Sequence, residues 1–170
     1  MKKVLIIGNC NHYFNRKLVA ELQKNDSNIL IDFFSINKPD HSLILPYNLV
    51  SDFSINKKEL SFFLKVPGIY TLYCYWCWNR ALKKKIKDGN YDYIHIQGLE
   101  VWQIGIHKLH KRIILTVWGS DFLRLSKTKL GIFKPFVSKL YKITFATKEV
   151  SNKFHEIFNT KEKHTIVKFG

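Results

Sequence analysis

The chain has 170 residues, 46% of them apolar and 15% aromatic, which suits one domain with a sizeable core and excludes a disordered or fibrous protein. Its apolar runs, such as residues 113–118, are too short to cross a bilayer, and three cysteines make no disulfide framework, so we expect a reducing, cytoplasmic location. Twenty-eight Lys and Arg against thirteen Asp and Glu leave a formal charge of +15, which attracts phosphorylated substrates, lipid head groups or nucleic acid.

Short β-rich runs alternate with helical patterns along the chain. We predict strands over residues 4–7, 28–34, 42–45, 93–97, 112–117, 143–146 and 165–167. We predict helices over residues 15–24, 57–65, 69–87, 101–110, 132–141 and 148–158, with a break at Pro67-Gly68. This alternation predicts an α/β fold: a Rossmann-like parallel sheet with helices on both faces, in a single domain.

Ligands of such sheets bind beyond the carboxyl ends of the strands, so the first loop, residues 8–14, is a candidate site. A strand, then Gly8 and a helix amino terminus favour a phosphate cradle built from free backbone N–H groups, with Asn9 and His12 beside it. The two further glycines of a dinucleotide site are missing, and Asp32 lies inside the second predicted strand rather than at its end. These departures argue against a dinucleotide and leave a general ligand-binding loop.

The second candidate loop follows residues 93–97. His95 and Gln97 alternate with apolar neighbours, so both side chains project to one face of the strand. Two interpretations stay open: satisfied polar groups beneath the strand end, or residues that line a pocket.

The third candidate loop is the most distinctive. A buried strand leads into Trp118, Gly119, Ser120 and Asp121. An indole offers an apolar face to a sugar ring, while a hydroxyl and a carboxylate hydrogen-bond to sugar hydroxyls, so the set suits a carbohydrate site. The alternative is that Ser120 or Asp121 only caps a following helix.

Cys74 and Cys77 have the spacing of a redox pair or of half a zinc site. They lie within a helical pattern, and no second Cys/His pair with ligand spacing follows. We therefore expect buried small side chains, with no metal site and no cofactor.

Four segments in register resemble one known family. Residues 91–98 read YDYIHIQG, 113–121 read IILTVWGSD, 143–149 read ITFATKE and 163–170 read KHTIVKFG. They are similar to the successive strand motifs of retaining GT-B glycosyltransferases of the group 1 class, and together with the first strand they span nearly the whole chain.

The resemblance implies the amino-terminal, acceptor-side domain of a two-domain enzyme. Such an enzyme moves a sugar from a nucleotide-diphosphate sugar to a polysaccharide, a lipopolysaccharide or a lipid-linked acceptor. Its second domain, which grips the nucleotide sugar, would lie outside these 170 residues, so we expect no transferase activity from them alone.

The resemblance also implies residue roles. Gly8 and Asn9 would approach the donor phosphates, His95 and Gln97 would line the cleft, and Ser120 and Asp121 would face a sugar as the catalytic pair. Trp118 replaces the usual histidine, and because an indole cannot accept a proton, no general base is assignable. The remaining expected substrate-binding residues are His12, Trp118, Gly119 and Lys148.

The predicted helix over residues 69–87 combines aromatic residues with a basic carboxyl end. This pattern suits an anionic membrane surface, which would make the protein peripheral on the inner face of the cell membrane. A solvated basic face is the second interpretation and nucleic acid the third. The competing function class is a non-enzymatic basic α/β module that binds nucleic acid or another polyanion.

Overall fold

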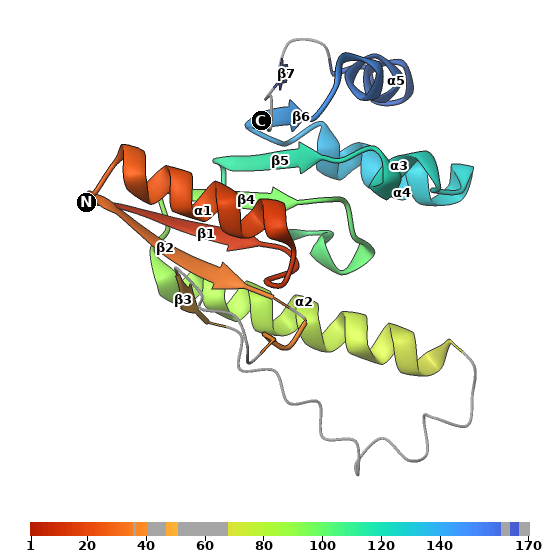
Figure 1. The fold of residues 1–170 in the computed structure, drawn as a ribbon. Helices are drawn as coiled ribbons and strands as arrows, with labels where there is room; N and C mark the ends of the chain where they lie inside the picture. Colours follow the sequence, from red (N-terminus) through yellow and green to blue (C-terminus); the bar gives the residue numbers. More distant parts are fainter. Residues whose placement is uncertain (36, 41–46, 51–67, 161–163, 167–170) are drawn as a thin grey trace.

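Short apolar runs form the strands of a parallel sheet (Figure 1). The computed structural model describes residues 1–35, 37–40, 47–50, 68–160 and 164–166. In these ranges the sheet has seven strands in the order β3-β2-β1-β4-β5-β6-β7, and all neighbouring pairs are parallel. The strands are β1 (Lys2–Ile7), β2 (Ile29–Phe34), β3 (Asn48–Leu49), β4 (Tyr93–Gln97), β5 (Ile113–Val117), β6 (Lys142–Phe145) and β7 (His164–Ile166). The predicted Rossmann-like sheet is confirmed.

Helices cover both faces of the sheet, as expected. Figure 1 shows α1 in front of β1 and β4, with α2 on the opposite side. One core cluster includes Ile6 and Ile31 with Val19 of α1, and the other includes Leu5 and Ile94 with residues of α2, α4 and α5. The helical segments are α1 (Tyr13–Asn25), α2 (Ile69–Gly89), η2 (Val101–Gln103), η3 (Ile106–Lys108), α3 (Ser120–Leu123), α4 (Lys127–Val137) and α5 (Lys148–Phe158).

Three sequence predictions of elements need correction. The helix predicted over residues 101–110 is two 3-10 turns, because Gly105 between them has a φ of 92°. The helix predicted over residues 132–141 is α4, which begins five residues earlier because the Ser126 hydroxyl accepts a hydrogen bond from the Lys129 N–H at 3.4 Å, and which ends at Val137. The short strand β3 was not predicted at Asn48–Leu49.

The strand predicted over residues 42–45 and the helix predicted over residues 57–65 lie outside the described residues. Cys74 is buried and Cys77 partly buried in α2, and both are free thiols, as expected for packing residues. None of the helices in the described ranges has both the length and the apolar character that a bilayer crossing needs.

A buried polar cluster ties β2 to the residues that flank it. The Asp32 carboxylate, 3% exposed, accepts hydrogen bonds from the Tyr91 hydroxyl at 2.7 Å and the Asn48 amide at 3.1 Å, and it forms an ion pair with the Lys3 ammonium at 3.5 Å. Both carboxylate oxygens therefore have partners within the protein. Burial and the bond to Asp32 raise the pKa of Tyr91, so its hydroxyl remains a donor at neutral pH. Asp32 is thus a structural residue, which agrees with the argument against a dinucleotide site.

Candidate functional site

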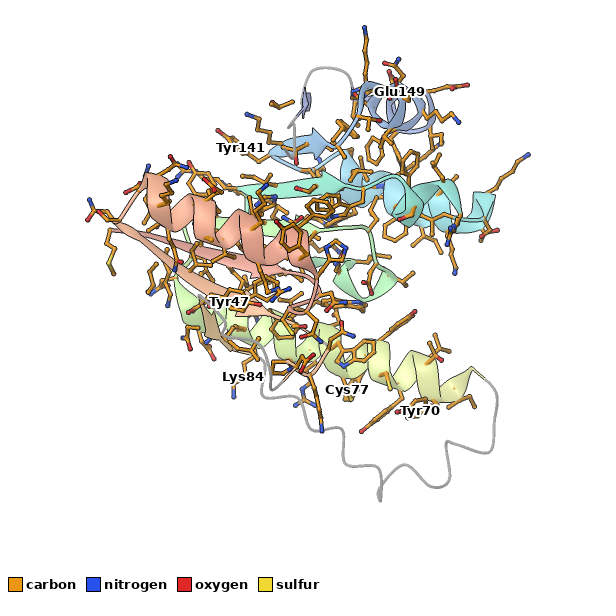
Figure 2. The ribbon with its side chains drawn as sticks, in the orientation of Figure 1. Tyr47, Tyr70, Cys77, Lys84, Tyr141 and Glu149 are labelled. Carbon is orange, nitrogen blue, oxygen red and sulfur yellow. The ribbon has the colours of Figure 1, made fainter. Side chains whose placement is uncertain are left out.

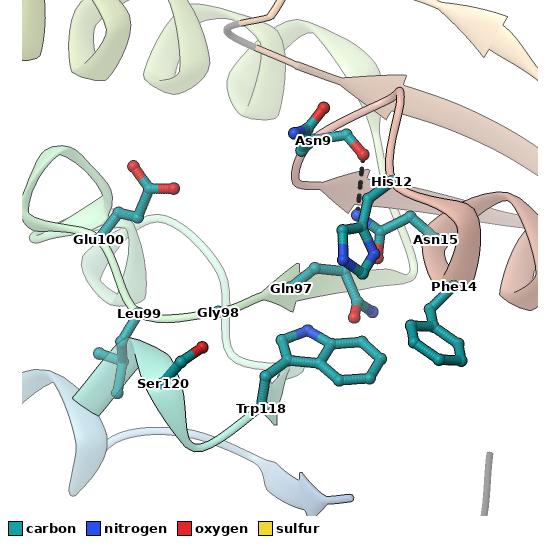
Figure 3. A pocket seen from close by; sticks show the side chains of 10 residues that line it. All are labelled: Asn9, His12, Phe14, Asn15, Gln97, Gly98, Leu99, Glu100, Trp118 and Ser120. Atoms are coloured by element: carbon teal, nitrogen blue, oxygen red, sulfur yellow. Dashed lines mark hydrogen bonds between the residues drawn. The ribbon is translucent and has the colours of Figure 1, made fainter. Parts of the chain in front are cut away.

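A pocket of about 310 Å³ lies beyond the carboxyl ends of β1, β4 and β5 (Figure 3). These three strands are neighbours in the sheet, so the loops that follow them meet at one edge. All three candidate loops of the sequence contribute to it. The lining residues are Asn9, His12, Phe14, Asn15, Gln97, Gly98, Leu99, Glu100, Trp118 and Ser120.

Aromatic rings from two loops form one wall of the pocket. The Trp118 ring stacks on Phe14, with 5.5 Å between centroids and 27° between planes, and it contacts the His12 ring at 5.9 Å. His12 and Phe14 also contact each other at 5.7 Å. The loop after β1 and the loop after β5 are therefore joined by an apolar surface of the kind on which a sugar ring stacks.

Gly8 lies directly beneath the pocket. A Cβ atom at this position would lie 2.9 Å from Gln97 Cβ and 3.0 Å from Asn15 Nδ2, so only a glycine fits without movement of its neighbours. Because Gly8 has no side chain, Gln97 and Asn15 can approach the same point from β4 and from α1. The residue shapes the pocket without lining it.

The backbone N–H groups of the first loop are mostly used inside the protein. Four of the five N–H groups of residues 8–12 donate to protein acceptors, and these four are not free for a phosphate. The four bonds run from Gly8 to the Phe34 carbonyl (3.1 Å), from Cys10 to Ser35 Oγ (3.2 Å), from Asn11 to Asn9 Oδ1 (3.0 Å) and from His12 to the Asn9 carbonyl (3.2 Å).

Asn15 lies in the first turn of α1 and points into the pocket floor (Figure 3). It is 3% exposed, and its Nδ2 donates to the Asn9 carbonyl at 2.9 Å, which fixes the orientation of the amide. Its Oδ1 is buried and has no hydrogen-bond partner among the described residues. The sequence did not indicate this residue, because a polar position in the first turn of a helix is typical of a solvated face.

Gln97 ends β4 and is 7% exposed. Its Nε2 lies 3.1 Å from His95 Nε2, which also lies 2.8 Å from the Thr116 hydroxyl. Burial lowers the pKa of His95 to about 4, so the ring is neutral at neutral pH. We assign its proton to Nδ1, the tautomer in which Nε2 accepts from Gln97 and from Thr116. Gln97 Oε1 remains buried without a partner among the described residues. Gln97 lines the pocket, whereas His95 lies below it and holds Gln97 in place.

The loop after β5 turns at Gly119, which has a φ of 97°. A Cβ atom there would also lie 2.9 Å from Val150 Cγ2 of α5, so two independent constraints favour glycine. Gly119 is the N-cap residue of α3 and makes no side-chain cap hydrogen bond; Ser120 follows as the first residue of α3 and lines the pocket. Asp121 is the second residue of α3; the structure describes its backbone and not its side chain.

Lys148 lies apart from the pocket. It is the first residue of α5, it is exposed, and it is not among the residues that line the cavity. Its neighbour Thr147 caps α5 by accepting a hydrogen bond from the Val150 N–H at 3.3 Å. Within the described ranges no three His, Cys, Asp or Glu side chains gather as a metal site would require.

Glu100 lies in the loop after β4 and lines the pocket, although the sequence had suggested no role for it. The Trp102 indole donates to its carboxylate at 2.6 Å, and Gln103 Oε1 accepts from its backbone N–H at 3.0 Å. The carboxylate therefore has a fixed position at the edge of the pocket. A signal was present in the sequence, because the acid lies three residues after the end of β4.

Comparisons with known proteins give a family and a fold. The sequence model of the family described as "Glycosyl transferase 4-like" matches residues 3–151. Among solved structures, a ugt transferase from Siraitia grosvenorii in complex with UDP matches with a TM-score of 0.56 at 8% identity, and the match covers 100% of this chain and 51% of that chain. This chain thus spans about half the length of that enzyme. No curated protein sequence matches.

Proposed function

Because this chain belongs to the glycosyl transferase 4-like family, we propose that it is the acceptor-side half of an enzyme that transfers a sugar from a nucleotide-diphosphate sugar. The family and the fold make it a glycosyltransferase domain rather than a non-enzymatic polyanion-binding module. The acceptor in this proposal is a polysaccharide, a lipopolysaccharide or a lipid-linked sugar. The reaction needs no cofactor beyond the nucleotide sugar itself.

One observation carries the proposal: aromatic and amide groups from three separate loops meet in one pocket. Trp118 supplies a flat apolar surface, and Asn15 and Gln97 supply hydrogen-bonding groups beside it. Sugar rings have apolar faces and polar edges, and they are recognised by this combination of stacking and hydrogen bonding. Ser120, and Asp121 one residue further on, stand in this proposal as the groups nearest the transferred sugar.

The donor side of the proposal rests on the half-length match. A chain that covers 51% of a complete glycosyltransferase has room for one of two Rossmann-like halves. We assign donor binding to a second domain, retention of anomeric configuration to the complete enzyme, and no transfer activity to these 170 residues alone.

The test uses the complete gene product with a panel of nucleotide-diphosphate sugars and with lipid-linked and soluble glycan acceptors. We expect transfer, with retained configuration in the product by NMR. Trp118→Ala should lower kcat/KM at least about tenfold, because it removes the stacking surface. The matched control is Trp76→Ala, which changes an exposed tryptophan of α2 and should leave transfer from a soluble acceptor unchanged.

Asp121→Asn in the same protein should lower turnover strongly while the melting temperature stays constant. Unchanged transfer by this variant would remove Asp121 from the catalytic set. Unchanged transfer by Trp118→Ala would contradict the pocket assignment as a whole.

The outer side of α2 supports contact with an anionic membrane. Leu72 is 68% exposed and Trp76 55% exposed, and the Arg80 guanidinium lies 5.5 Å from the centroid of the Trp76 ring. Further along the helix, Lys84 points away from the sheet (Figure 2). Trp76 and the basic residues also line a hollow of about 530 Å³. Apolar and aromatic groups followed by lysines suit the head-group region of a bilayer.

Vesicle binding tests this part of the proposal. The chain should sediment with phosphatidylglycerol vesicles in low salt, and less so with phosphatidylcholine vesicles. Replacement of Arg80, Lys84 and Lys87 by alanine should abolish most of the binding. The matched control removes the same charge from α4, by alanine at Lys127, Lys129 and Lys134. Equal loss in both variants, or stronger binding to an oligonucleotide than to vesicles, would contradict a membrane-facing α2.

A further inference from the structure

The two buried amide oxygens of the pocket allow the proposed function to be made more specific. Asn15 Oδ1 and Gln97 Oε1 come from different elements, yet both reach the pocket and neither has a hydrogen-bond partner among the described residues. An unpaired buried acceptor destabilises a fold, so two of them in one cavity are expected where water or a ligand satisfies them.

The orientation of both amides is set by their nitrogen atoms. Asn15 Nδ2 donates to the Asn9 carbonyl. With the His95 proton assigned to Nδ1, Gln97 Nε2 donates to His95 Nε2. In this tautomer, rotating either amide would place an oxygen against an acceptor. The protein therefore holds both oxygens toward the cavity and uses its own donors to do so.

The remaining lining groups make the pocket poor in positive charge. Glu100 contributes a carboxylate, and no Lys or Arg appears among the described lining residues despite the net charge of +15. The backbone N–H groups of Gly8, Cys10, Asn11 and His12 donate within the protein. A phosphate would find no cation among these lining residues and would meet the Glu100 carboxylate and two unpaired amide oxygens, which disfavours an anion.

We propose that Asn15 and Gln97 are specificity-determining residues that accept hydrogen bonds from two hydroxyl groups of an uncharged sugar ring stacked on Trp118. This inference rests on the proposed function and makes it more specific. It assigns the pocket to a neutral glycan unit. The donor phosphates then lie elsewhere, in contrast to the expectation that Gly8 and Asn9 approach them.

Gly8 helps to bring the Asn15 and Gln97 side chains together. The space left by its missing side chain lets the two amides converge, since a Cβ atom there would lie 3.0 Å or less from both residues. On the far side of Gln97, the hydroxyl of Thr116 holds His95, and Thr144 contacts Thr116 at 2.8 Å. Gln97 is thus supported from β4, β5 and β6, which limits its movement when no ligand is present.

The test measures binding of small neutral sugars to the chain by tryptophan fluorescence and saturation-transfer NMR. The probes are methyl glycosides of common hexoses, analogues of the best binder that each lack one hydroxyl, and methyl phosphate. We expect a methyl glycoside to bind, two of the deoxy analogues to bind about tenfold more weakly, and methyl phosphate not to compete.

Two variants assign those hydroxyls. Gln97→Met and Asn15→Leu keep the side-chain size and remove the acceptors; each should weaken the parent glycoside about tenfold and remove the penalty of one deoxy analogue. Gln97→Met should also raise the melting temperature of the unliganded chain by about 2–4 °C, because it removes an unpaired buried oxygen. Gln23→Met, at a partly buried position of α1 that does not line the pocket, is the matched control and should change neither quantity.

The outcomes separate the inference from the proposed function. If a glycoside binds and both variants bind it equally well, the acceptor pair is overturned while the sugar pocket stands. If Gln97→Met lowers the melting temperature, its oxygen has a structural role and the inference fails. If methyl phosphate binds in place of the glycosides, the pocket is an anion site and the inference fails. If no glycoside binds, the proposed pocket itself is overturned.

Discussion

Two buried polar clusters of this domain differ in one respect: whether their acceptors are satisfied. Around Asp32, the carboxylate oxygens receive bonds from Tyr91 and Asn48 and face the ammonium of Lys3. Around Gln97, donors are paired with His95, but an amide oxygen is left toward the cavity. A complete network stabilises the fold, whereas an incomplete one at a cavity indicates a binding surface. Buried polar groups alone therefore do not identify a binding site, whereas an unpaired buried acceptor at a cavity does.

The largest effect should come from breaking the complete cluster. Asp32→Ala leaves the buried hydroxyl of Tyr91 and the ammonium of Lys3 without their partner, so we expect a loss of about 3–5 kcal/mol in the free energy of unfolding. Urea unfolding measures it. Glu156→Ala, at an exposed acid of α5, should change stability by less than about 0.5 kcal/mol. A loss below about 1 kcal/mol for Asp32→Ala would show that the complete cluster contributes little to the free energy of unfolding.

Lowering the pH should destabilise the protein through His95, which belongs to the incomplete cluster around Gln97. The pKa of His95 is lowered from its ordinary value of 6.5 to about 4, so the unfolded chain takes up the proton first as the pH falls. The stability that the neutral ring contributes is complete above about pH 6.5 and is lost progressively toward pH 4, by up to about 3 kcal/mol.

Urea unfolding at several pH values measures this slope. His95→Gln should flatten it, although His107, whose pKa burial also lowers, keeps a contribution of the same sign. An unchanged slope in His95→Gln would show that His95 is solvated in its charged form.

Crowding the pocket floor should have a smaller effect. Gly8→Ala pushes a methyl group against Gln97 Cβ, an atom fixed to the backbone of β4, and should cost about 1–3 kcal/mol. Gly131→Ala is the matched control: nothing lies within 4 Å of its added Cβ in α4, and the change should stabilise the protein by about 0.5–1 kcal/mol. If Gly8→Ala is as harmless as Gly131→Ala, Gly8 does not hold the amides together.

The smallest effect is expected at Thr144, whose hydroxyl contacts the Thr116 hydroxyl that in turn contacts His95. Thr144→Val removes a hydroxyl that lies 2.8 Å from Thr116 Oγ1 and should cost about 1 kcal/mol. Thr128→Val, at an exposed position in α4, serves as its control and should stay within about 0.5 kcal/mol. A shift of the His95 pKa in Thr144→Val, followed by NMR, would extend the network to β6.

The central strands were predictable because each is a short apolar run that is buried inside the sheet. β1, β4, β5 and β6 are central, apolar and short, and their boundaries differ from the predictions by at most two residues. The 3-10 turns after β4 were not predictable as such, because the apolar spacing of residues 101–110 fits a helix and only the positive φ of Gly105 divides it. The start of α4 was missed because its first turn is basic rather than apolar, and its signal was the cap at Ser126.

The location of the pocket followed from the sequence, since parallel strands carry their loops to one edge. Its chemistry did not. Asn15 lies seven residues after Gly8 in a helix, and nothing local shows that the missing side chain of Gly8 lets Asn15 meet Gln97. Likewise, a free phosphate cradle was expected from strand, glycine and helix, whereas bonds to Phe34, to Ser35 and within the loop use four of the five N–H groups of residues 8–12. In both cases contacts between residues far apart in the sequence decide the chemistry of the pocket.

The length of α2 has a consequence for where the reaction would take place. Its 21 residues reach about 31 Å, whereas the five residues of β4 cover about 17 Å. Figure 1 shows its amino-terminal end overhanging the tips of the strands, on the side where the pocket opens. A bilayer that held Leu72 and Trp76 would therefore lie level with the pocket mouth. A lipid-borne acceptor could then reach the enzyme by lateral diffusion, in two dimensions instead of three.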